Sequence, residues 1–124
     1  MIHLTLPWPP SLNTMYPTGK NGRRFLSKKG AAYAVIASGQ ARMARAGCGP
    51  LMGRLGYKLV LWPPDKRIRD LSNYLKAIED CMTKGGLWED DSQVDIIHVV
   101  RGDVAKGGVA EIVVWQLDSE IAPY

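Results

Sequence analysis

A chain of 124 residues is long enough for one folded domain, and no run approaches the ~20 apolar residues that a membrane-spanning helix needs. The hydrophobic fraction of 46% with 23% charged residues is typical of a globular protein with a core of its own, which excludes a disordered chain. The first ten residues lack the pattern of a secretory signal, and the two cysteines have neither metal-site nor redox spacing. We therefore expect a cytoplasmic protein with reduced thiols.

The first half of the chain is predicted to form a strand and a helix. Residues 1–8 alternate apolar and polar side chains, as a half-buried strand does, and the prolines at 7–10 end the strand because proline lacks the ladder amide. Residues 11–22 are predicted to be a polar loop. An alanine-rich helix is predicted over residues 27–46, ending at Gly47.

The second half is predicted to form a strand, a helix and two further strands. Residues 55–62 alternate, and residues 71–84 repeat apolar side chains at helical spacing. Residues 94–101 and 109–117 are predicted to pair as a hairpin, and residues 118–124 as a flexible tail.

This order of elements predicts an α/β (α+β) fold in a single domain over residues 1–117. It contains a mixed four-stranded sheet and two main helices, in the order β-α-β-α-β-β.

Basic residues gather in two segments, although the net charge of +4 is modest. A phosphate backbone would explain such clusters, and a solvated charged surface is the alternative. The predicted phosphate-contacting side chains are Lys20, Arg23, Arg24, Lys28, Lys29, Lys66, Arg67 and Arg69.

Asp70, Asn73 and Lys76 share one face of the second predicted helix. Asp70 is either a site residue or a helix N-cap that accepts the amide hydrogen of Asn73. Lys76 is either a catalytic side chain or the partner of an ordinary ion pair with Asp80.

A second acidic cluster, Glu89 to Asp91, lies in the turn that follows this helix. It is either a solvated turn or a source of hard oxygen ligands of the kind that magnesium prefers.

Several short motifs resemble the RusA family of Holliday-junction resolvases. They are RDLSN at 69–73 followed by Lys76, GLWEDDSQ at 86–93, PPSLN at 9–13 and SKKG at 27–30. The resemblance covers about residues 9–101, and the agreement of separated motifs with their spacing makes it specific.

The resemblance implies a homodimeric, Mg²⁺-dependent endodeoxyribonuclease that resolves four-way DNA junctions in recombination and repair, with no membrane partner and no organic cofactor. By position, Asp70 and Asp91 are the metal-binding and catalytic acids, Asp90 is the neighbouring acid, and Lys76 is the catalytic lysine. Asn73 is carried over as a DNA contact.

Ser72 departs from the family pattern, which has a second aspartate at this position. Three interpretations are open. The serine binds the metal through its hydroxyl or a water, with Asp90 supplying charge; the protein binds junctions and cleaves them weakly or not at all; or the serine is an introduced change that traps an inactive form. Retention of the other motif residues favours activity; these are Asp70, Asn73, Lys76, Asp90 and Asp91.

Overall fold

The computed structural model describes residues 1–117, so the predicted tail at 118–124 lies outside the described residues. Its elements are β1 (Ile2–Pro7), α1 (Leu12–Met15), α2 (Lys28–Ala44), β2 (Leu55–Trp62), the 3₁₀ helix η1 (Leu71–Tyr74), α3 (Leu75–Lys84), the 3₁₀ helix η2 (Asp91–Gln93), β3 (Val94–Arg101) and β4 (Val109–Gln116). The predicted single-domain fold, with a mixed four-stranded sheet and two main helices, is confirmed.

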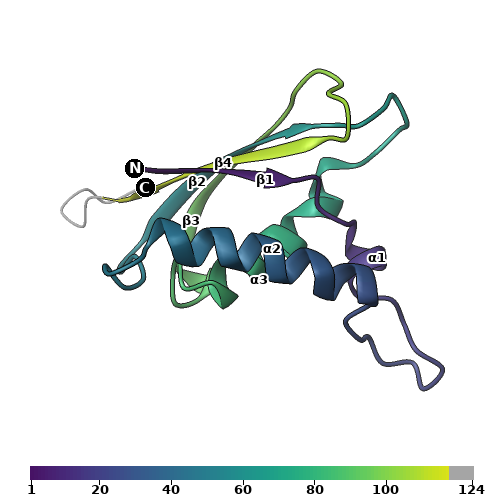
Figure 1. The fold of residues 1–124 in the computed structure, drawn as a ribbon, viewed down its shortest axis with the longest axis horizontal. Helices are drawn as coiled ribbons and strands as arrows, with labels where there is room; N and C mark the ends of the chain where they lie inside the picture. Colours follow the sequence, from purple (N-terminus) through teal and green to yellow (C-terminus); the bar gives the residue numbers. More distant parts are fainter. Residues whose placement is uncertain (118–124) are drawn as a thin grey trace.

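The four strands form one sheet in the order β1-β4-β2-β3 (Figure 1). β4 pairs antiparallel with β1 and β2, whereas β2 and β3 are parallel. The predicted hairpin between β3 and β4 is therefore wrong. Ala110, Ile112 and Val114 of β4 are fully buried, and a central position gives this apolar strand a hydrogen-bonding partner on each edge.

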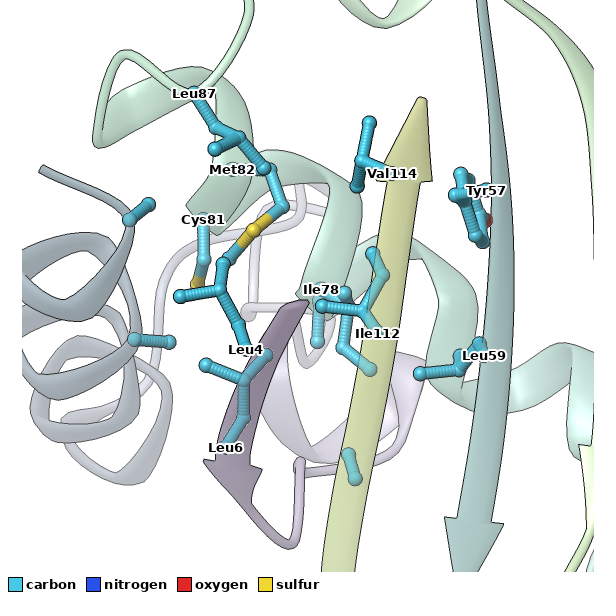
Figure 2. Packing of buried hydrophobic residues seen from close by; sticks show 14 of the residues in the cluster. Leu4, Leu6, Tyr57, Leu59, Ile78, Cys81, Met82, Leu87, Ile112 and Val114 are labelled. Atoms are coloured by element: carbon cyan, nitrogen blue, oxygen red, sulfur yellow. The ribbon is translucent and has the colours of Figure 1, made fainter. Parts of the chain in front are cut away.

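The helices lie on one face of the sheet, and the core fills the space between the two layers (Figures 1 and 2). β2 directs Leu55, Tyr57, Leu59 and Leu61 into this core, each with 0% exposure, as its alternation predicts. From α3, Ile78 and Met82 pack against the strands, together with the other side chains of one buried cluster.

α1 and α2 each begin at a serine whose side chain accepts a backbone amide of the first turn. The Ser27 hydroxyl accepts the Gly30 amide at 3.0 Å, which confirms the predicted start of α2. α2 ends at Ala44, two residues before the predicted end. The predicted loop at 11–22 contains α1, four residues capped by Ser11, which is too short for a periodic pattern to reveal.

α2 and α3 approach each other closely at Gly85, just beyond the end of α3. A Cβ atom added at Gly85 would lie 2.6 Å from Cβ of Ala41 and closer still to the carbonyl oxygen of Ser38. Only glycine therefore fits at this helix crossing.

On the other face of the sheet, Trp115 packs directly over Gly56. Between residues 1 and 117, none of the helices is both long enough and apolar enough to cross a bilayer. Cys48 and Cys81 are both free thiols, as predicted.

Candidate active site

The basic segments that are distant in sequence converge at one end of the molecule. Lys20, Arg23 and Arg24 lie in the α1–α2 connection, which projects from the body beside the N-terminus of α2 (Figure 1). Lys29, from the first turn of α2, lines a groove together with Arg67, from the connection after β2. The remaining predicted phosphate contacts belong to the same two segments and are Lys28, Lys66 and Arg69.

Arg69 is largely occupied by contacts within the protein. Its guanidinium lies 2.8 Å from the carboxylate of Asp65 and 5.6 Å from the ring centroid of Trp8, and its side chain is only 12% exposed. Hydrogen bonds from Arg69 and from the Arg67 amide hold the pKa of Asp65 below its usual range. Arg69 therefore stabilises the connection after β2 by joining Asp65 to Trp8.

Asp70 immediately precedes η1, and its carboxylate is exposed. Asp70 occupies the N-cap position of η1, but its side chain makes no cap hydrogen bond, so the predicted bond from the Asn73 amide to the Asp70 side chain does not form. The Asn73 amide instead donates to the backbone carbonyl of Asp70 at 3.1 Å. Ser72 and Asn73 are exposed on the same short helix, which leaves all three side chains accessible to a ligand.

Lys76 lies on the exposed side of α3 in an ion pair with Asp80, at 3.0 Å between Nζ and Oδ1. The Tyr16 hydroxyl donates to the other oxygen of Asp80. The hydrogen bond with Asp80 is the main cause that raises the pKa of Lys76, and Asp91 and Glu79 also favour its charged form. The ammonium is therefore paired with Asp80 and favoured in its charged form.

Asp91 is oriented by two neutral donors. Trp88 Nε1 donates to Asp91 Oδ1 at 3.0 Å, and the Thr83 hydroxyl donates to the same oxygen. In the described part of the chain, no hydrogen bond reaches Oδ2. In metal sites, a ligating carboxylate is often held by hydrogen bonds to one oxygen while the other oxygen binds the metal. Asp91 has this arrangement of donors.

Asp90 caps η2 through a capping box. Its carboxylate accepts the Ser92 amide at 3.0 Å, and the Gln93 side chain accepts the Asp90 amide at 3.0 Å. The contacts with Ser92 lower the pKa of Asp90. The side chains of Asp90 and Asp91 therefore point to different partners. Asp90 caps η2, whereas Asp91 accepts hydrogen bonds from Thr83 and Trp88.

Glu79 was not predicted as a site residue, yet it belongs to this acidic region. It is half-buried on α3, and the hydroxyl of Tyr57 donates to its carboxylate. Burial raises the pKa of Glu79, and the charge of Asp91 adds to this effect. The sequence could have indicated Glu79 as a site residue, because it lies three residues after Lys76 on the same face of the helix.

Asp70 precedes η1 and Asp91 begins η2, so the η1–α3 segment lies between them in the chain. Asp91 contacts Thr83 near the end of α3, and its charge also acts on Lys76 in the first turn of α3. Within residues 1–117, no group of three His, Cys, Asp or Glu side chains could hold a metal ion. Magnesium often uses only one or two carboxylates plus water and substrate phosphate, so the donor chemistry of Asp91 still fits this ion.

A family model described as endodeoxyribonuclease RusA matches residues 7–115, which span both the basic end and the acidic region. The chain belongs to this family. It is 37% identical over 118 residues to the crossover junction endodeoxyribonuclease RusA of Enterobacteria phage 82, covering 95% of this chain and 97% of the relative. It is 38% identical over 117 residues to the proteins of that name from Shigella sonnei (strain Ss046) and Escherichia coli (strain K12), covering 94% of this chain and 96% of each relative.

The raised pKa of Glu79 predicts how the stability of this RusA-family chain depends on pH. A carboxyl whose pKa is higher in the folded state binds its proton more tightly there, so its contribution to stability falls as pH rises from the unfolded pKa through the folded one. Glu79→Gln keeps a hydrogen-bond acceptor for Tyr57 but has no ionisable carboxyl. The substitution should therefore remove the fall in folding stability that ionisation of Glu79 causes. We expect a gain of up to about 1 kcal/mol at pH 7, because the carboxylate is only half-buried.

Urea unfolding of Glu79→Gln and wild type at pH 4 and pH 7, without divalent ions, measures this gain. The stability difference should appear at pH 7 and shrink at pH 4. Equal differences at both values would contradict the burial argument.

Proposed function

We propose that this protein is a Mg²⁺-dependent, structure-selective endodeoxyribonuclease that resolves four-way DNA junctions in recombination and repair. The observation that carries the proposal is the identity of 37–38% to crossover junction endodeoxyribonucleases over almost the whole chain. The oriented carboxylate of Asp91, the restrained Lys76 and the basic end of the molecule support it.

Asp70 and Asp91 are the proposed metal ligands, with Asp90 and Ser72 as further oxygen donors. When bound, Mg²⁺ supplies Lewis-acid activation of water and offsets charge that develops on the phosphate oxygens. Thr83 and Trp88 hold Asp91 in one orientation. The ammonium of Lys76, positioned by Asp80, would stabilise negative charge on the phosphate in the transition state.

The second candidate function is junction binding with weak or no cleavage. Ser72 favours it, because a neutral hydroxyl stands where the family pattern has an acid, and the described residues hold no three-acid group. The basic end would still bind phosphates in such a protein.

One assay separates these functions. Labelled four-way junction and linear duplex are incubated with wild type, Asp70→Asn and Ser72→Asp, with Mg²⁺ or with EDTA. Mg²⁺-dependent nicking of the junction that Asp70→Asn abolishes supports the nuclease. A junction-specific mobility shift without nicks, converted to cleavage by Ser72→Asp, supports the binding protein. No shift even at low salt would contradict both, because electrostatic binding is strongest there.

We also propose that the protein acts as a homodimer, since two related sites can nick two strands of like polarity. The sheet face without helices carries half-buried apolar side chains, including Val60, Val113 and Trp115, which a second copy would cover. Light scattering at micromolar concentration should give about twice the 13.7 kDa of one chain. A monomer mass would contradict this proposal.

A further inference from the structure

We propose that the groove between α2 and the β2–η1 connection binds one unpaired DNA base together with its phosphate, at the branch point of the junction. This inference rests on the proposed function, because it assumes a branched DNA substrate. It adds a nucleotide subsite at the basic end of the molecule, apart from the Asp91 region.

The groove has an apolar floor and a basic rim. It is an open groove with a volume of about 580 Å³, which is enough space for a nucleotide-sized group. Trp8, Pro9 and Ile36 supply apolar surface, while Lys29 and Arg67 supply positive charge. A flat aromatic ring with an attached anion matches this combination better than an apolar peptide or a free phosphate does.

Ile36 is an unusual residue for the exposed side of a helix. It is 52% exposed on α2 and forms part of the groove wall. Val35, the preceding residue, is 69% exposed and is not part of this wall. The two neighbours thus provide a matched comparison between apolar surface inside and outside the groove.

The first turn of α2 concentrates positive potential at the rim. It contains Lys28 and Lys29 and no acidic residue, although the helix dipole disfavours cations at an N-terminus. A bound phosphate would offset both the dipole and the lysines. This charge arrangement therefore favours an anion on the Lys29 side of the groove.

Trp8 is fixed in position before any ligand binds. Its ring lies 5.0 Å from the ring of Tyr74 and beneath the guanidinium of Arg69, which Asp65 holds in turn. A Cβ atom at Gly108 would lie 2.8 Å from Cβ of Trp8, so the backbone there packs against the indole. A braced aromatic side chain loses little freedom when a base binds.

An unpaired base is favoured over intact duplex because the faces of paired bases are covered by their stacked neighbours. Bases at a branch point unstack at lower cost than bases within a duplex. A groove of this kind would then discriminate branched from linear DNA without reading sequence.

The test measures binding in EDTA, so that cleavage does not contribute. Four-way junctions carry 2-aminopurine, or an abasic site, at each branch-point nucleotide in turn. The proteins are wild type, Ile36→Glu, Lys29→Ala and Val35→Glu, each checked for folding by circular dichroism. Ile36→Glu and Val35→Glu introduce the same charge on the same helix, but only the first enters the groove.

We expect one position at which 2-aminopurine fluorescence changes on binding wild type and Val35→Glu, with the change lost in Ile36→Glu and reduced in Lys29→Ala. An abasic site at that position should weaken junction binding by the wild type about ten-fold. The same abasic site should not change the junction affinity of Ile36→Glu.

Equal weakening by both glutamate variants, or no fluorescence change at any branch-point position, would overturn the subsite while leaving junction binding in place. Failure of wild type to bind any junction at low salt would overturn the proposed function and the subsite together.

Discussion

Asp91→Asn is expected to lower junction cleavage at least about 100-fold while junction binding in EDTA stays within a few-fold of wild type. The amide oxygen of asparagine can still accept from Thr83 and Trp88, so the local fold should be retained. The substitution removes the negative charge of the carboxylate proposed to hold Mg²⁺, and loss of one preorganised electrostatic group in an active site typically lowers the rate about 10²–10³-fold. Single-turnover cleavage of a labelled junction, paired with a mobility-shift titration, measures both quantities.

Glu89→Gln is the matched control, because it removes one negative charge from the same turn. Glu89 is exposed, and no side-chain contact with the rest of residues 1–117 fixes its carboxylate. Its cleavage rate should stay close to wild type. Equal losses in both variants would show that the turn acts only through its total charge, and near-normal cleavage by Asp91→Asn would remove Asp91 from the proposed site.

Gly85→Ala is expected to destabilise the fold by about 2–3 kcal/mol, which is large for a single methyl group. The cause is steric, because the new Cβ would overlap Ala41 and the backbone of Ser38. Both neighbours belong to the rigid middle of α2, so α2 and α3 must separate to admit the methyl group. Urea denaturation should show a lower midpoint with an unchanged slope.

Gly39→Ala, on the same helix α2, is the control with the opposite expected sign. No atom outside the local helix lies within 4 Å of a Cβ added at Gly39. Alanine should therefore stabilise α2 by about 0.5–1 kcal/mol through its higher helix propensity. If Gly85→Ala and Gly39→Ala had the same effect, propensity rather than packing would govern both sites.

Local patterns in the sequence predicted most elements of the fold. The alternation in β2 places Leu59 in the core, and Ser27 marks the start of α2, because side-chain period and capping depend on neighbouring residues. The pairing of β4 could not be predicted in this way. Its partners β1 and β2 are distant in sequence, and the short β3–β4 connection suggested a hairpin that does not form.

In the candidate site, too, local motifs could be predicted from the sequence, whereas tertiary contacts could not. Asp91 and Lys76 were predicted from motifs that lie within the residues matched by the family model, and their catalytic roles stay a prediction. The contacts that position Asp91, from Thr83 and Trp88, and the pairing of Glu79 with Tyr57 depend on tertiary structure. Residue spacing on α3 could have drawn attention to Glu79, but nothing local in the sequence places a tyrosine from β2 beside it.

The central position of β4 has a consequence for how the chain assembles on the ribosome. β1 emerges first, yet its partner β4 is the last strand of the described region, so β1 and one edge of β2 remain unpaired until residues 109–116 are available. Unpaired edges of this kind are prone to association with other chains. Nascent chains stalled before residue 109 should therefore be protease-sensitive and candidates for chaperone capture, and the sheet should close late, in one step.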